Sequence, residues 1–142
     1  MTALLVALGG ALGAVLRSVT DGEIKLRSRR TWPIATLCIN VVGSFVLGLV
    51  AALNTSATVT AFVVPGVCGG FTTFSTFTLE TAQLMEQGRP WLAAAYAGGS
   101  ALVSLLALFL GSAIVATLLL WRRRTPALAA GPARPVVAAI GV

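Results

Sequence analysis

The chain has 142 residues, 57% of them hydrophobic and 10% charged, and its mean hydropathy of +0.94 indicates solvation by a lipid bilayer. It contains no histidine and only four acidic residues. A catalytic site built on imidazole or paired carboxylates is therefore disfavoured, and we predict that the chain is not an enzyme. The formal charge of +6 comes from basic residues next to apolar runs, which favours interfacial anchoring and argues against nucleic acid as a partner.

Four apolar stretches follow one another along the chain, and about 20 residues of helix cross the hydrocarbon core of a bilayer. We predict membrane-spanning helices over residues 2–20, 32–53, 59–86 and 91–121. Residues 1–124 then form one four-helix membrane subunit. Residues 125–142 are rich in Ala, Pro and Gly without periodicity, and we predict a disordered tail there.

Small residues recur at helix-contact spacing in the first two spans. The pairs are Gly9 with Gly13, Gly10 with Ala14, and Ser44 with Gly48. Small residues four positions apart allow two membrane helices to approach closely. The pattern indicates tight helix packing and carries little information about function.

The second and fourth spans each carry a row of polar residues at four-residue spacing, on one helix face. The rows are Thr36, Asn40 and Ser44, and Tyr96, Ser100 and Ser104. An asparagine inside a membrane is costly without partners, so Asn40 must face protein or a watery path. On this pattern alone, hydrogen bonds that hold helices together and a polar conduction path both remain open.

The third span contains the segment GGFTTFSTF at residues 69–77. Two glycines followed by many hydroxyl side chains form a poor hydrocarbon helix, because glycine tolerates non-helical angles and hydroxyls satisfy released backbone groups. Broken helices within a membrane present carbonyl groups to cations and helix N-termini to anions. The sequence therefore predicts that the third helix is broken near the bilayer midplane.

These motifs together resemble the Fluc-type (CrcB-like) fluoride channels. The resemblance rests on GGFTTFSTF at 69–77, TLCINVVGSFVLG at 36–48 and GGALGAVLR at 9–17. It implies an all-α integral membrane protein that works as an antiparallel, dual-topology dimer in the plasma membrane of a prokaryote. There it would export cytoplasmic fluoride passively and protect the cell from fluoride toxicity.

The resemblance also implies the partners and the functional residues. The partners are fluoride, membrane lipid, and either a second copy or an oppositely oriented paralogue. Backbone carbonyls of Gly69, Thr72 and Thr73 would hold a structural sodium ion at the dimer centre. The positive ring edges of Phe74 and Phe77 would face the fluoride path. The other pore positions are Arg17, Asn40, Ser75, Thr76, Glu80, Tyr96, Ser100 and Ser104.

Two alternatives remain open beside the channel. A small four-helix proton-coupled exporter relies on a carboxylate in its first span, which residues 2–20 lack, and Glu80 is the acid that lies well within a predicted span. A non-transporting assembly subunit would use the polar rows only for packing. The basic residues on the two sides of the four spans number six and four, so the charge pattern does not choose between a homodimer and a paralogue pair.

Overall fold

The computed structural model describes residues 1–27, 33–53 and 55–129, and every element within these ranges is helical. The elements are α1 (Thr2–Arg27), α2 (Ile34–Ala52), α3 (Ala57–Ala61), η1 (Phe62–Cys68), α4 (Gly69–Phe71), α5 (Phe74–Glu86) and α6 (Pro90–Ala129). Four helical segments are long and apolar enough to cross a membrane, namely Thr2–Arg27, Ile34–Ala52, Ala57–Glu86 and Pro90–Arg124. The prediction of an all-α protein with four spans is confirmed.

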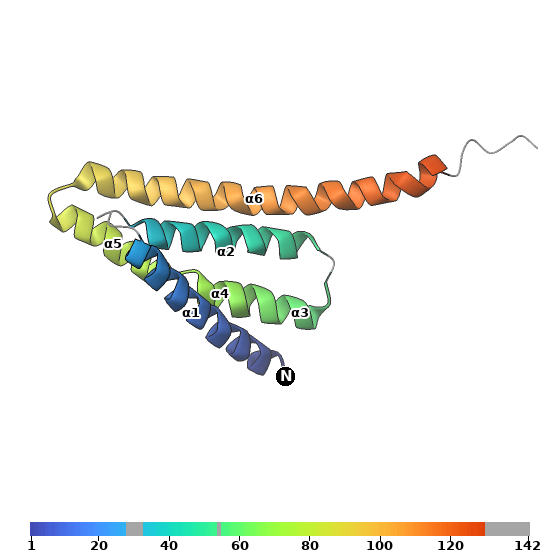
Figure 1. Cartoon of the computed structure of the whole chain (residues 1–142), viewed down its shortest axis with the longest axis horizontal. Helices are drawn as coiled ribbons and strands as arrows, with labels where there is room; N and C mark the ends of the chain where they lie inside the picture. Colours follow the sequence, from blue (N-terminus) through green and yellow to red (C-terminus); the bar gives the residue numbers. More distant parts are fainter. Residues whose placement is uncertain (28–32, 54, 130–142) are drawn as a thin grey trace, which may run out of the picture.

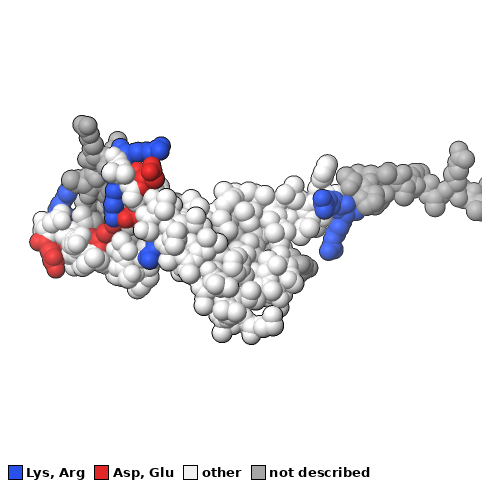
Figure 2. Space-filling model, turned by 60° about the horizontal axis from the view of Figure 1, so that its bottom comes forward, with Lys and Arg blue, Asp and Glu red and all other residues white. Residues whose placement is uncertain are grey.

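The long helix α6 lies beside α2, and α1 crosses the α3–α4 segment obliquely (Figure 1). The hairpin between α5 and α6 closes one end of the molecule. Charged side chains gather at the two ends of the face shown in Figure 2, and the surface between them is almost free of charge. An apolar belt between charged ends is the distribution expected of a chain that spans a bilayer.

Glycines allow the helices to approach to backbone contact, as the small-residue pairs predicted. A side chain at Gly9 would meet the carbonyl oxygen of Phe62, and one at Gly13 would meet that of Val67, so α1 packs directly on η1. Gly48 in α2 lies in the same way against the carbonyl of Leu108 in α6. These contacts position α1 against the third span and α2 against α6.

The third span is interrupted at Thr72 and Thr73, which confirms the predicted break. Both residues are extended, with ψ angles of 159° and 121°, and α5 begins at the next residue. Ahead of the break lies the π-helical stretch η1, which the sequence analysis did not predict. It contains Pro65, whose missing N–H cannot take part in the α-helical hydrogen-bond pattern.

The helix boundaries differ from the prediction at three places. α1 continues past residue 20 to Arg27, supported by the ion pairs Asp21–Lys25 (2.7 Å) and Glu23–Arg27 (3.1 Å) at helical spacing. The third span begins at Ala57, where the Ser56 side chain caps the helix. α6 runs past residue 121 to Ala129, into the predicted tail, because arginine continues a helix readily. Residues 130–142 of that tail lie outside the described residues.

Candidate functional site

The break between α4 and α5 is held by Asn40, which projects from α2. Its Nδ2 donates to the carbonyl oxygen of Thr73 at 3.1 Å, and its Oδ1 accepts from the backbone N–H of Thr73 at 2.9 Å. A buried backbone group without a partner costs about 1–3 kcal/mol, and Thr73 is buried. The Asn40 amide therefore stabilises the extended conformation of the break with both of its ends.

Threonine hydroxyls satisfy further backbone groups at the two helix ends. The Thr72 hydroxyl donates to the Cys68 carbonyl at 2.9 Å, and the Thr73 hydroxyl accepts from the backbone N–H of Thr76 at 3.2 Å. Because the Thr73 N–H donates to Asn40, the Gly69 carbonyl loses the partner that an unbroken α-helix would give it. The break thus offers a carbonyl-rich helix end to a cation and the N-terminus of α5 to an anion.

A cavity of about 420 Å³ lies beside the break, bounded by α2, η1, α5 and α6. Eight of the predicted site residues line it, namely Asn40, Gly69, Thr72, Thr73, Phe74, Phe77, Ser100 and Ser104. The rings of Phe74 and Phe77 stand 5.8 Å apart, and Phe74 is 77% exposed. Among the described residues, no charged side chain lines this cavity.

Three serine hydroxyls in the cavity wall are free to meet a bound ion. They belong to Ser44, Ser100 and Ser104, and within the described ranges no hydrogen bond joins them to another protein group. Threonines elsewhere on the helices instead bond their own backbone, as Thr78, Thr81 and Thr117 do. Ser44 was not among the predicted pore residues, although its four-residue spacing from Asn40 could have identified it.

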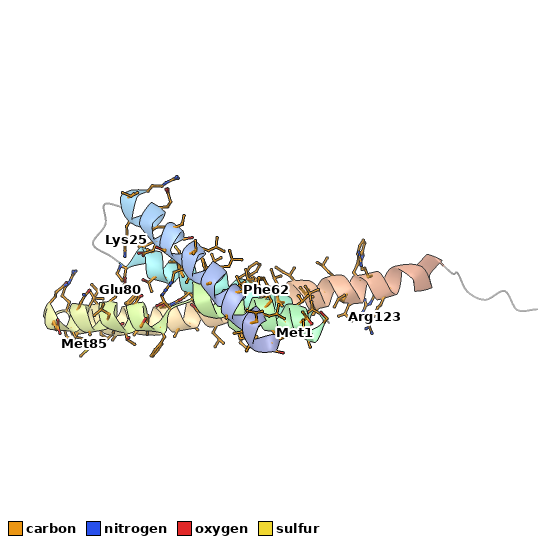
Figure 3. All side chains as sticks on the ribbon, turned by 90° about the horizontal axis from the view of Figure 1, so that it is seen from below. Met1, Lys25, Phe62, Glu80, Met85 and Arg123 are labelled. Carbon is orange, nitrogen blue, oxygen red and sulfur yellow. The ribbon has the colours of Figure 1, made fainter. Side chains whose placement is uncertain are left out.

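Glu80 does not line this cavity, and Tyr96 contacts both Glu80 and the ring of Phe77. Its Oε1 accepts from the Thr36 hydroxyl at 2.9 Å, and its Oε2 accepts from the Tyr96 hydroxyl at 2.8 Å. The Tyr96 ring stands 5.5 Å from that of Phe77. Figure 3 places Glu80 on α5 towards the end that carries Met85. Thr36, which is 1% exposed, was missed as a site residue although it begins the polar row of the second span.

A second cavity of about 260 Å³ lies on the other side of Thr73. Its lining is Arg17, Ser18 and Asp21 from α1, with Thr36, Ile39, Thr73 and Thr76. Ser75 is exposed at the start of α5, with its hydroxyl 3.3 Å from that of Thr73. The structure therefore divides the predicted pore residues between two cavities and the Glu80 cluster, with Ser75 outside all three.

Replacing Tyr96 by phenylalanine tests the Glu80 cluster. The change removes one donor to the carboxyl group and keeps the ring against Phe77, so we expect a loss of stability of about 1–2 kcal/mol. Unfolding in mixed detergent micelles measures this loss. The matched control is Thr81→Val, which removes a hydroxyl that bonds only its own helix backbone. An equal loss in both variants would contradict a special role for the cluster.

The similarity to known proteins covers the segments that form the break and the two cavities. A profile described as "CrcB-like protein, Camphor Resistance (CrcB)" matches residues 4–112 of the chain. The chain belongs to the CrcB family. Within it, "Fluoride-specific ion channel FluC" of Rhodospirillum centenum is 43% identical over 119 residues, covering 80% of this chain and 94% of the relative. The proteins of the same name from Agrobacterium fabrum and Cereibacter sphaeroides are 42% and 44% identical, covering 78% and 79% of this chain and 92% of each relative.

The CrcB match contains every predicted site residue, from Arg17 to Ser104. It also contains the break and both cavities that flank Thr73. Among the described residues, no group of three or more His, Cys, Asp or Glu side chains could hold a metal ion.

Proposed function

We propose that this chain is the subunit of a passive, fluoride-selective channel in the plasma membrane of a prokaryote. It exports cytoplasmic fluoride, protects the cell from fluoride toxicity and has no catalytic activity. The observation that carries the proposal is the uncharged cavity beside the break, which combines two phenylalanine rings with unpaired serine hydroxyls. Membership in a family whose relatives are named fluoride-specific ion channels supports the choice of ion.

The cavity suits a small, strongly hydrated anion. Hydroxyl donors replace water around fluoride, and a hydrogen bond to a charged acceptor is stronger than one between neutral groups. The positive edge of a phenyl ring adds a weak electrostatic attraction, which Phe74 and Phe77 can supply. A fixed cation in the cavity would hold the anion tightly, whereas several weak sites allow it to leave.

No energy source is needed for export. A membrane potential that is negative inside favours the exit of an anion by about 2.3 kcal/mol per charge per 100 mV. The proton-coupled alternative would use Glu80, whose two carboxyl oxygens both accept hydrogen bonds from the protein. We expect fluoride transport by the unmodified protein to be independent of a proton gradient, and Glu80→Gln to leave it so. Proton-coupled transport by the unmodified protein that Glu80→Gln abolishes would favour the exporter.

The dimer and its sodium ion are further parts of the proposal. The ion would be a structural cofactor at the dimer centre, held by the backbone carbonyls of Gly69, Thr72 and Thr73. The released carbonyl of Gly69, which is an exposed residue, supports this site. Thr73 already accepts one hydrogen bond from Asn40, and its carbonyl oxygen keeps a second lone pair for a cation.

A second subunit would cover apolar surface that the single chain exposes. The ring of Phe74 is 77% exposed beside the break. In a membrane protein either lipid or a second subunit covers such a ring, and the position of Phe74 in the cavity wall supports a second subunit. We propose an antiparallel partner, which is either an identical copy or an oppositely oriented paralogue.

Fluoride efflux from liposomes that hold only the purified protein tests the channel directly. A fluoride electrode records the efflux, valinomycin clamps the potential, and chloride-loaded liposomes run in parallel. We expect fast efflux of fluoride and not of chloride, slowed about tenfold or more by Phe74→Ile. Because the Phe74 ring is exposed in the subunit, that variant should retain its fold. Absence of efflux from folded protein would show that this chain does not form a channel without a different partner chain.

The serine hydroxyls should affect transport without affecting stability. Ser100 and Ser104 make no hydrogen bond to the protein within the described ranges, so alanine at either position leaves no buried group unpaired. We expect each variant to slow fluoride efflux and to unfold at the same detergent concentration as the unmodified protein. A loss of stability with unchanged efflux would assign these hydroxyls to helix packing.

A further inference from the structure

α6 extends well beyond the C-terminal end of α2, which lies beside it. Ser112 on α6 donates to the carbonyl of Gly48 on α2 at 3.0 Å, which fixes the register of the two helices. α2 ends at Ala52, four residues after Gly48, so α6 reaches the same level near Val115. Val115 is also the last buried residue of α6 among residues 90–124. The next nine residues, 116–124, rise about 14 Å further, and we call them the α6 overhang.

The α6 overhang combines an apolar part with a basic end. Figure 1 shows the end of α6 extending beyond α3 and the N-terminus. Leu118 and Leu120 are 56% and 58% exposed, and Trp121 is 64% exposed. Exposing apolar surface to water costs about 25 cal/mol of free energy per Å². Something apolar must therefore cover it.

Within the described residues, no acidic side chain forms an ion pair with Arg123 or Arg124. The chain has four acidic residues, Asp21, Glu23, Glu80 and Glu86. On the face shown in Figure 2, the acidic side chains lie at the end opposite to the basic cluster of α6. Arg123 and Arg124 are exposed, so an anion from outside the subunit can reach both of them.

We propose that the α6 overhang lies in the membrane interface and binds anionic lipid headgroups. A phospholipid supplies both parts that the overhang needs, acyl chain for the leucines and phosphate for Arg123 and Arg124. Tryptophan prefers the membrane interface, between the acyl chains and the phosphate groups. Arginine next to a span attracts anionic lipid. The site lies outside the stretch that matches the CrcB family, which ends at residue 112.

Fluorescence quenching by brominated lipids tests this site. Trp32→Phe and Trp91→Phe leave Trp121 as the only tryptophan of the full chain. The protein is reconstituted in vesicles of brominated phosphatidylcholine or brominated phosphatidylglycerol, and the quenching gives the relative association of the two lipids with Trp121. We expect a several-fold preference for phosphatidylglycerol, which disappears in R123Q/R124Q. Arg89→Gln, at the opposite end of α6, should retain the preference.

Two results would overturn the proposal. Equal quenching by both lipids in the parent protein would show that the basic end does not select anionic headgroups. No quenching by either lipid would show that protein, such as a second copy of the chain, covers Trp121. Circular dichroism and size-exclusion chromatography check that R123Q/R124Q is folded before its lipid preference is interpreted.

Discussion

Replacing Asn40 by alanine is expected to abolish fluoride efflux and to lower the free energy of unfolding by about 3 kcal/mol, because two buried backbone groups lose their partner. Both groups belong to Thr73, so the extended conformation between α4 and α5 loses its support from α2. The cavity wall that depends on this conformation then rearranges. Liposome efflux and unfolding in mixed micelles measure the two effects.

Two further variants separate the bonds from the side-chain volume. Ser44→Ala changes the same face of α2 without removing a protein hydrogen bond, and we expect its stability to be unchanged. Asn40→Asp keeps an acceptor for the Thr73 N–H but loses the donor to its carbonyl, and it places a carboxylate beside the fluoride path. We expect that variant to fold with reduced stability and to conduct poorly. Normal efflux and normal stability of Asn40→Ala would refute the role of the amide.

Replacing Gly9 by alanine is expected to lower stability by displacing α1 from the third span. A methyl group there would meet the Phe62 carbonyl oxygen and lie 3.0 Å from the Cα of Gly66. Both neighbours are backbone atoms and cannot rotate away, so α1 must move off η1. Overpacking of this kind costs about 1–3 kcal/mol and more where backbone must shift.

The adjacent glycine provides the control. A methyl group at Gly10 would meet no atom within 4 Å in the subunit. Alanine also favours a helix over glycine by up to about 1 kcal/mol, so Gly10→Ala should leave stability unchanged or raise it. Unfolding of the two variants under identical detergent conditions gives the comparison. Equal stability of Gly9→Ala and Gly10→Ala would contradict the close packing of α1 on η1.

The sequence was sufficient to predict the features that arise from local composition. Long apolar runs predicted four spans, and GGFTTFSTF predicted the interruption that lies at Thr72 and Thr73. The cost of an unpaired amide in a membrane predicted that Asn40 needs protein partners or a watery path. Its two bonds to Thr73 satisfy that need.

The remaining features depend on how distant segments cross, which spacing along the chain does not determine. Thr36 and Glu80 are 44 positions apart, and only the packing of α2 on α5 brings them together. The row of Tyr96, Ser100 and Ser104 suggested one continuous hydroxyl path. In the structure the Tyr96 hydroxyl bonds Glu80 behind Phe77, while the two serines line the cavity. The π-helical stretch contains Pro65, but many membrane helices tolerate a proline, so the proline alone did not predict a π-helical stretch.

The π-helical stretch η1 sets the angular phase of everything that follows it in the third span. A π-helical turn holds one residue more than an α-helical turn, and one residue corresponds to about 100° of rotation around a helix axis. If Phe62–Cys68 became a regular α-helix with all of its residues, Gly70 would rotate away from α1 and Thr73 away from Asn40. Deleting one residue there would remove the excess and keep the phase of the following helix nearly unchanged. This segment should therefore tolerate the loss of one residue far better than the gain of one, which would turn α5 by about 100° relative to α1 and α2.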